Sequence, residues 1–197
     1  SLELLREGKP PRLVERKTEE ERAFRMLGLM TSKPVLYVCN VDEASAKHGN
    51  EFARLVEARA KEEDAVAVVI SAKIESEIAT LSREERAEFL ATLGLEEAGL
   101  DRLIRAGYEL LHLITYFTAG EKEVRAWRIK KGWKAPQAAG VIHTHFEKGF
   151  IRAEDIKLSD YKKYKTEQGC KEAGKMGVEG KEYVVEDGDI MHFRFNV

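Results

Sequence analysis

The 197-residue sequence has no long apolar run, few cysteines and no strong excess of either charge. A transmembrane helix needs about 20 consecutive apolar residues, and no segment approaches that length, so the sequence predicts no membrane span. Two cysteines, Cys39 and Cys170, are too few to staple a small secreted domain, which favours a reduced, cytoplasmic protein. With 33 basic and 35 acidic residues the net charge is −2, so bulk charge gives no indication of DNA binding.

What the sequence does contain is two short apolar segments, at 35–39 and 66–70, separated by a helical pattern. These segments lack the polar alternation of a half-exposed strand, which is typical of parallel strands covered on both faces. Two such strands joined by a helix predict a right-handed β-α-β unit. A helix is predicted next over 82–93, where Ser82 and Glu85 form a capping box, and another amphipathic helix follows it.

Each apolar segment ends abruptly in polar residues, which are Asn-Val-Asp-Glu at 40–43 and Ser-Ala-Lys at 71–73. In open α/β sheets, ligands bind outside the carboxyl ends of the strands. An Asn there can hold a purine N7, and a carboxylate three residues later can face the edge of the base. Backbone N–H groups of the Ser-Ala-Lys turn can donate to an exocyclic atom. The alternative is an ordinary turn, in which Asn40 and Asp42 satisfy local backbone groups.

Beyond residue 112 the pattern changes to short strands. A hairpin around a Gly-containing turn comes first. A short helix is predicted over about 136–146, and strands are predicted at 150–157, 182–186 and 190–195. This order suits a small sheet wrapped round one helix, the β-grasp arrangement.

Four long blocks of the sequence carry a resemblance to a known family. They are "KPVLYVCNVDE", "EERAEFLATLGLEEAGLDRLIRAGYELLHLITYFTAGEKEVRAWRI", "APQAAGVIHTHFEKGFIRAEDI" and "YKTEQGCKEAGKMGVEGKEYVVEDGDIMHFRFNV". Together they resemble the C-terminal half of the YchF/Obg-like ATPases. The resemblance implies an α/β fold, with a partial P-loop NTPase parallel-sheet domain followed by a TGS domain of β-grasp (ubiquitin-like) fold. Residues 1–33 would end a helical, coiled-coil-like insertion, 34–111 would form the C-terminal part of the nucleotide-binding domain, and 112–197 the TGS domain.

The resemblance also implies a ribosome-associated, translation-linked regulator that binds and hydrolyses ATP. The residues assigned to the nucleotide base are Asn40, Val41, Glu43, Ser71, Ala72 and Lys73. Val41 would contact the face of the ring. ATP is expected to be preferred over GTP, because Glu43 is one methylene longer than the Asp that reads guanine in related GTPases, and mispaired polar groups reduce affinity strongly. Adenine also has no 2-amino group, and its N1 is an acceptor that a carboxylate would repel.

The sequence departs from this family in lacking a G-x-x-x-x-G-K-[ST] motif and a clear D-x-x-G metal loop. In P-loop NTPases these motifs supply the phosphate cradle, its lysine and the Mg²⁺-binding hydroxyl. We therefore predict no catalytic residue and no metal ligand in this chain. The chain alone is expected to bind ATP weakly and to hydrolyse none. Mg²⁺ is implied only for a full-length parent protein.

Basic residues interleaved with tryptophan follow in the hairpin region and indicate a surface for RNA or the ribosome. They are Lys122, Arg125, Arg128, Lys130 and Lys131. Because residues two apart share one face of a strand, 125 lies opposite 128 and 130, and only part of this set can form a patch. A solvated sheet face is the alternative for these residues. For the whole chain, the alternative is a stand-alone, non-catalytic module that binds RNA or the ribosome.

Overall fold

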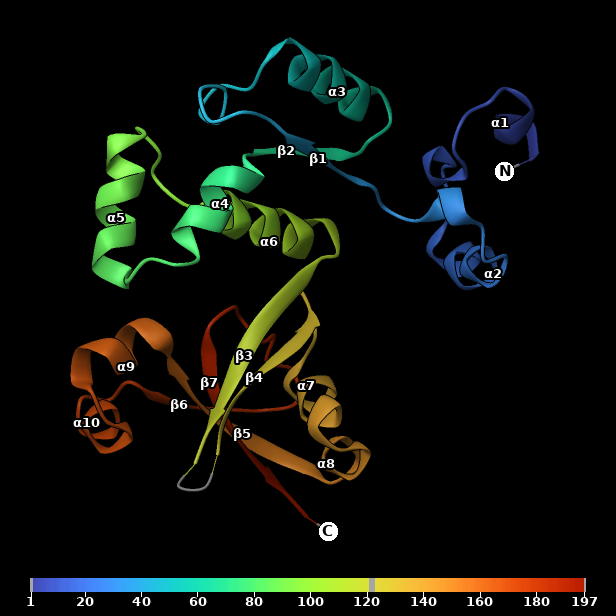
Figure 1. Cartoon of the computed structure of the whole chain (residues 1–197). Helices are drawn as coiled ribbons and strands as arrows, with labels where there is room; N and C mark the ends of the chain where they lie inside the picture. The colour runs from blue at the N-terminus through green and yellow to red at the C-terminus, as the bar shows by residue number, and fades with distance from the viewer. Residues whose placement is uncertain (1, 121–122, 197) are drawn as a thin grey trace. The chain divides into compact units, whose positions relative to one another are not determined.

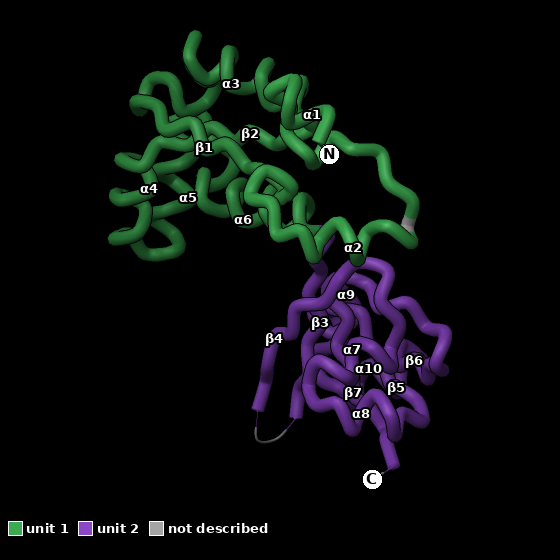
Figure 2. Tube along the Cα trace, turned by 90° about the vertical axis from the view of Figure 1, so that its right-hand side faces the viewer, with its two compact units in different colours: residues 1–111 green, residues 112–197 purple. Residues whose placement is uncertain are grey.

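The computed structural model describes residues 2–120 and 123–196, apart from the side chain of Thr18. The chain divides into two compact units, residues 1–111 (unit 1) and residues 112–197 (unit 2), coloured separately in Figure 2. Both units combine helices and strands, as Figure 1 shows, so the predicted α/β class is confirmed. None of the helices in the described part of the chain qualifies as a transmembrane span.

Unit 1 opens with short helical turns. They are α1 (Leu2–Arg6), η1 (Pro11–Leu13), η2 (Thr18–Glu20), α2 (Glu21–Met26) and η3 (Met30–Ser32). Arg12 ties this segment to the rest of the unit, because its Nη2 donates to Oε2 of Glu63 at 2.6 Å. The hydroxyl of Tyr37 donates to the same oxygen at 2.7 Å. One carboxylate therefore joins the opening segment to the sheet.

The centre of unit 1 is a two-stranded parallel sheet of β1 (Leu36–Asn40) and β2 (Val66–Ile70). Asn40 pairs with Ile70, so both strands end at the same level. Helix α3 (Glu51–Glu62), which joins the strands, lies on one face of the sheet, and α6 (Gly99–Leu110) lies on the other (Figure 1). The structure thus has the strand–helix–strand unit that the sequence predicts.

Two further helices of unit 1 lie between β2 and α6 in the chain. They are α4 (Ala72–Ile78) and α5 (Arg83–Thr92). The predicted capping box opens α5, since the Ser82 N–H donates to Oε2 of Glu85 at 2.9 Å and the Glu85 N–H donates to Oγ of Ser82 at 3.3 Å. These two bonds satisfy backbone donors that have no partner within the helix.

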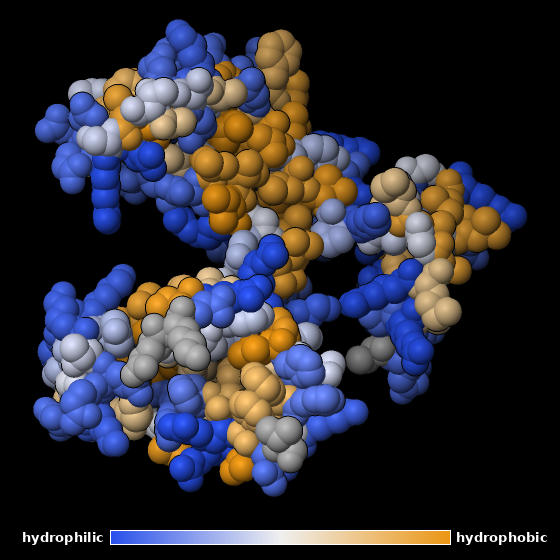
Figure 3. Space-filling model, turned by 60° about the horizontal axis from the view of Figure 1, so that its bottom comes forward, coloured by the Kyte–Doolittle hydropathy of each residue, from blue (hydrophilic) through white to orange (hydrophobic). Residues whose placement is uncertain are grey.

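Unit 1 exposes a large apolar area (Figure 3). Phe52 and Leu55 of α3 are 75% and 63% exposed, and Leu100 and Ile104 of α6 are also exposed. Two strands are too narrow to cover the apolar sides of both helices. Large exposed apolar side chains of this kind are typical of a region that packs against further protein.

One edge of β2 is covered by an arginine. The carbonyl of Ile70 accepts the Val41 N–H at 2.9 Å, on the side of β1. Consecutive carbonyls of a strand point to opposite sides, so the carbonyl of Val69 faces away from β1. Nη2 of Arg102, from α6, donates to that carbonyl at 3.0 Å. The carbonyl of Val69, at the edge of β2, thereby has a hydrogen-bond partner.

Unit 2 is a mixed five-stranded sheet in the order β4-β3-β7-β5-β6. Its strands are β3 (Leu113–Ala119), β4 (Val124–Lys130), β5 (Phe150–Lys157), β6 (Met176–Glu179) and β7 (Asp189–Phe195). Strands β3 and β4 form the predicted hairpin, and β3 pairs in parallel with β7. Helix α7 (Ala135–Ile142) packs on the sheet through Ala135, Ala138 and Ala139, which have no exposed surface. The small side chains let this helix lie close to the sheet.

The structure of unit 2 differs from the sequence prediction in three places. The sequence predicts a strand over 182–186, whereas the structure has the sheet strand β6 earlier, at Met176–Glu179, and Val184 makes only an isolated bridge to Lys134. The helix predicted over 136–146 is interrupted at His143, whose extended backbone separates α7 from α8 (Thr144–Lys148). Helices α9 (Leu158–Tyr164) and α10 (Glu167–Glu172) have no counterpart in the prediction. Strand β6 is short and glycine-containing, and its pairing with β5 stabilises it more than its own composition does.

Candidate functional site

Two polar turns lie together at the carboxyl end of the unit 1 sheet. Asn40 is the last residue of β1, and Ala72 opens α4, two residues after the end of β2. Oδ1 of Asn40 accepts the backbone N–H of Ala72 at 2.9 Å. The structure therefore brings together the two turns that the sequence analysis selected.

An ion pair makes a second contact between these turns. Nζ of Lys73 lies 2.9 Å from Oε2 of Glu43. The two side chains are 67% and 43% exposed, respectively. The hydrogen bond to Glu43 raises the pKa of Lys73 above its ordinary value. At neutral pH the lysine is therefore protonated, and its charge balances that of the carboxylate.

Two of the selected residues are buried. Val41 is 9% exposed and Ser71 is 3% exposed. Val41 therefore has little surface to offer to the face of a purine ring. Oγ of Ser71 has no hydrogen-bond partner among the described residues. Burying a hydroxyl without a hydrogen-bond partner lowers the stability of the folded state, so Ser71 destabilises this turn relative to a residue without a hydroxyl.

The polar groups of the two turns fit a purine. The oxygen of the Asn40 amide is identified by the bond from Ala72, because only the oxygen can accept that N–H. The amide nitrogen of Asn40 is then left to donate, and purine N7 is an acceptor. Glu43 and Lys73 add an acceptor and a donor to the same edge of the sheet.

Glu75 is a positioning residue that the sequence analysis does not identify. Its Oε1 accepts the N–H of Gly99 at 2.7 Å, and its Oε2 accepts the N–H of Leu100 at 3.2 Å. Ala98, at the N-cap of α6, provides no side-chain cap, so the carboxylate of Glu75 replaces it. Because Glu75 follows Lys73 closely on α4, this bond fixes the second polar turn against α6. A Glu in a helix is too common to signal this role from sequence.

The basic residues of β4 divide between the two faces of the unit 2 sheet. Arg125 lies on the face of Trp127, with its guanidinium carbon 4.2 Å from the ring centroid. Arg128 and Lys130 lie on the opposite face, as the period of a strand requires. The structure therefore separates Arg125 from the other two.

The remaining basic candidates, Lys122 and Lys131, add no residue to the face that Arg128 and Lys130 share on β4. Lys131 is exposed just after the end of β4, and Lys122 lies outside the described residues. Arg152 and Arg194, which the sequence analysis does not select, are exposed cross-strand partners on β5 and β7. They lie on the sheet face opposite the buried Ala153. Nη2 of Arg194 also donates to Glu154 at 3.1 Å, which offsets part of its charge.

Comparisons with known proteins bear on both units. Residues 113–196 match the family model YchF-GTPase_C, described as a protein of unknown function (DUF933). The chain is 55% identical over 191 residues to the ribosome-binding ATPase YchF of Bacillus subtilis (strain 168), covering 96% of this chain and 52% of that protein. The resemblance to YchF proteins is confirmed. The YchF of Escherichia coli O157:H7 is also 55% identical, over 186 residues that cover 94% of this chain and 51% of that protein.

A solved YchF structure extends the likeness to three dimensions. The Schizosaccharomyces pombe YchF GTPase matches with a TM-score of 0.81 and 39% identity, over 97% of this chain and 51% of that one. The chain thus spans about half the length of the YchF proteins that it matches, and it corresponds to their C-terminal part.

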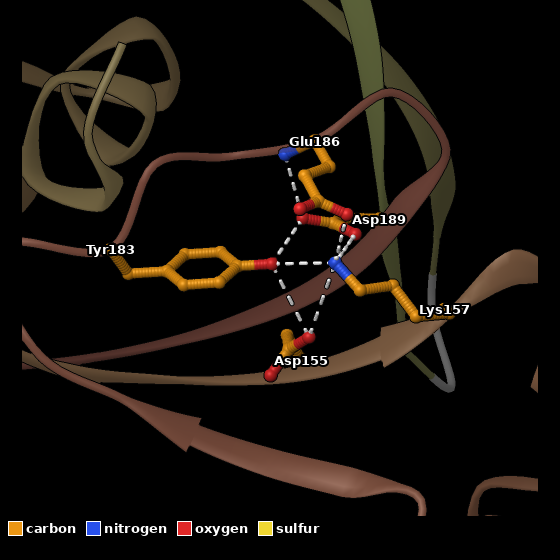
Figure 4. Close-up of polar contacts among 5 residues, drawn as sticks. All are labelled: Asp155, Lys157, Tyr183, Glu186 and Asp189. Atoms are coloured by element: carbon orange, nitrogen blue, oxygen red, sulfur yellow. Dashed lines mark hydrogen bonds and ion pairs between the residues drawn. The ribbon is translucent and has the colours of Figure 1, made fainter. Parts of the chain in front are cut away.

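The YchF-GTPase_C match includes a charged cluster in unit 2, drawn in Figure 4. Nζ of Lys157 donates to Asp189 at 2.7 Å, to the hydroxyl of Tyr183 at 2.8 Å and to Glu186 at 2.9 Å. The Tyr183 hydroxyl donates to the other oxygen of Asp189 at 2.6 Å. The cluster connects β5, β7 and the segment between β6 and β7.

Burial and hydrogen bonding both shift the pKa values of this cluster. Burial alone would lower the pKa of Lys157, but its hydrogen bonds to Asp189, Tyr183 and Glu186 raise it instead. Burial raises the pKa of Tyr183 and of Asp155. Oδ1 of Asp155 has no hydrogen-bond partner among residues 2–120 and 123–196. The other groups satisfy one another, so the cluster in this YchF-like unit has the character of a structural network.

Proposed function

We propose that unit 1 provides the base-binding side of an adenine-nucleotide site in a YchF-type, ribosome-associated ATPase. The hydrogen bond between Asn40 and Ala72 is the main support, because it joins two turns at the carboxyl ends of neighbouring parallel strands. Nucleotides bind at this edge of α/β sheets. The amide nitrogen of Asn40 would donate to purine N7. Glu43, Lys73 and the turn at 71–72 would face the edge of the ring.

The division into domains belongs to the same proposal. Residues 1–33 would end a helical insertion, 34–111 would complete a P-loop nucleotide-binding domain, and 112–197 would form a TGS domain. A mixed sheet wrapped round α7 supports a β-grasp fold for this last part. A protein that works on ribosomes would act in the cytoplasm.

Hydrolysis and Mg²⁺ binding would belong to the full-length protein. No group of three or more His, Cys, Asp or Glu side chains within the described ranges is arranged to hold a metal ion. The sequence also has no G-x-x-x-x-G-K-[ST] motif to hold phosphates. The chain by itself would therefore bind ATP weakly and turn over none.

Calorimetric titration of the full-length protein with ATP and GTP tests this proposal. ATP is expected to bind more tightly than GTP. Asn40→Ala is expected to weaken ATP binding at least about tenfold, because it removes both the N7 donor and the tether to Ala72. Asn50→Ala is a matched control, since Asn50 caps α3 through a bond to the Ala53 N–H and lies outside the two turns. Tighter binding of GTP would contradict the proposal.

A surface of unit 2 that contacts the ribosome or its RNA is the second part of the proposal. The names of the bacterial relatives and the shared face of Arg128 and Lys130 support it. Phosphate contacts weaken as salt rises. Ribosome co-sedimentation should therefore decrease between low and moderate salt. It should decrease further in the double variant Arg128→Ala, Lys130→Ala than in Arg125→Ala, whose side chain lies on the other face.

A non-catalytic binding module remains the alternative function. It differs from the first proposal in one observable, because such a module would bind ribosomes without binding a nucleotide. Ribosome binding by a full-length protein that shows no heat of ATP binding would favour this alternative.

A further inference from the structure

A cavity of about 230 Å³ lies on the face of the unit 2 sheet that α7 does not cover. Ala153 packs against α7, so the next residue of β5, Glu154, points to the other side of the sheet. Ile156 and Ile190, which pair across β5 and β7, lie on the same side as Glu154. All three line the cavity, so these two strands form its floor.

The floor of this cavity is apolar, whereas its polar lining includes two carboxylates. Ile156 and Ile190 belong to the floor, and Glu154 of β5 and Glu167 of α10 are the carboxylates. The side chain of Glu154 is only 18% exposed. Its Oε2 accepts from Nη2 of Arg194 at 3.1 Å, which leaves Oε1 to accept from a ligand. No lysine or arginine lines the cavity among the described residues, so its charge is negative.

The size and charge of the cavity indicate one long cationic side chain as its occupant. Pockets for drug-sized ligands begin at about 300 Å³, so this cavity is too small for a nucleotide. An arginine side chain has an apolar stem for the floor and a cationic head for the two carboxylates. Tyr161 and His192 also line the cavity, and a guanidinium stacks on aromatic rings. Carboxylates repel phosphate groups, which disfavours RNA at this place.

A second cavity, of about 490 Å³, adjoins the first beside α10. The two cavities share Glu154, Glu167 and Met176. The second one adds Lys171 and Arg194, so its charge is mixed. Together the cavities form a groove that is longer than one side chain, which favours an extended peptide over a small amine as the ligand.

We propose that this groove binds a basic, extended segment of a partner protein and takes one arginine side chain into the smaller cavity. The inference goes beyond the proposed function and does not depend on it. Val124, which lines the cavity, begins β4, whereas Arg128 and Lys130 lie toward its other end. A basic peptide and a phosphate would therefore contact different parts of the same sheet face.

Peptide binding to variants of the whole chain tests the proposal. A fluorescein-labelled peptide of four Gly-Arg repeats is titrated with each protein, and its fluorescence anisotropy is measured. Glu154→Gln keeps an oxygen for Arg194 and is expected to weaken binding at least about tenfold, since the lost charge is mostly buried. Glu167→Gln removes an exposed charge and should weaken it up to about fivefold. Ala119→Leu narrows the cavity without a change of charge and should weaken binding about tenfold.

Glu172→Gln is the matched control, because Glu172 is an exposed residue of α10 outside the lining of both cavities. It changes the net charge by the same amount and should leave the affinity unchanged. Amide NMR spectra of the wild type provide a measurement that needs no variant. The resonances of Glu154 and His192 should shift when the peptide is added, and that of Ala138, on the α7 side of the sheet, should not.

Four results would overturn the inference. They are no peptide binding by the wild type, an equal loss in Glu172→Gln, full affinity in Ala119→Leu, and resonance shifts confined to the α7 side. A labelled decauridine RNA is titrated in parallel, and its affinity should be the same for the wild type and Ala119→Leu. RNA binding that is lost in Ala119→Leu would assign the groove to nucleic acid and contradict a peptide site. The titrations contain no ATP or GTP, so their outcome is independent of the proposed nucleotide site.

Discussion

The ammonium group of Lys157 lies 2.7 Å from Oδ1 of Asp189, a carboxylate with no exposed surface. Asp189 also accepts from the Tyr183 hydroxyl at 2.6 Å and from the Glu186 N–H at 2.9 Å. A buried charge is tolerated only when it is paired and hydrogen-bonded, and here three donors surround one carboxylate. Asp189 is thus the centre of the network that joins β7 to β5.

Replacing Asp189 should destabilise unit 2 strongly. In Asp189→Ala the three donors lose their acceptor, and the free energy of unfolding is expected to fall by about 3 kcal/mol. Glu186→Ala removes a carboxylate that is 69% exposed from the same lysine, and should cost less than about 1 kcal/mol. Urea unfolding followed by tryptophan fluorescence measures both, since Trp127 and Trp133 both lie in unit 2. Equal losses in the two variants would contradict a central role for Asp189.

The burial of Asp155 should make the stability of unit 2 depend on pH. Burial raises its pKa above the ordinary 3.8, so the folded state binds more protons than the unfolded state above that pH. Stability therefore decreases as pH rises from 3.8 through the raised value. Asp155→Asn removes this loss, so the difference in stability between variant and wild type should move in favour of the variant as pH rises. A difference in stability that stays constant across this pH range would contradict this role of Asp155.

Two glycines of α6 should respond in opposite directions to substitution by alanine. A Cβ at Gly99 would lie 2.9 Å from Oε1 of Glu75 and 3.1 Å from Cγ2 of Ile70, so Gly99→Ala should destabilise unit 1 by about 2 kcal/mol. A Cβ at Gly107 would meet nothing within 4 Å. Gly107→Ala should therefore stabilise the helix by up to about 1 kcal/mol. Amide exchange in α6 measures both effects, and a gain of protection in Gly99→Ala would contradict the packing of Glu75.

Residues 112–197 should fold independently of residues 1–111. The two units each form a compact set of contacts, and the core of unit 2 is built entirely from its own residues. An isolated 112–197 fragment is expected to unfold in one cooperative transition, with the same urea midpoint by tryptophan fluorescence as the whole chain. A fragment without a cooperative transition would show that unit 2 depends on unit 1.

The parts of the fold that could be predicted depend on residues close in the chain. The apolar runs of β1 and β2 and the capping box of Ser82 and Glu85 are local signals. The meeting of Asn40 and Ala72, 32 residues apart, could be predicted because parallel strands bring their carboxyl ends to one edge. Whether these residues bind a base stays a prediction.

The parts that could not be predicted depend on distant partners. The carboxylate of Glu75 finds its partner Gly99 24 residues away, and the Asp189 network joins residues up to 32 apart through ordinary-looking side chains. The burial of Val41 could not be predicted either, because an apolar residue in a turn looks the same in the sequence whether its side chain is buried or exposed. Strand β6 depends on its neighbour β5, and its short Gly-containing sequence gives little sign of it.

The bond from Arg102 to the carbonyl of Val69 makes the two edges of the unit 1 sheet unequal as places for a further strand. A strand arriving alongside β2 would have to displace a guanidinium, whereas no side chain of the described residues makes a hydrogen bond to the backbone of β1. Any additional strand, whether from a longer polypeptide or from a neighbouring molecule, would therefore be admitted beside β1. The side chain of Arg102 would thus let a further strand pair with β1 and hinder pairing with β2.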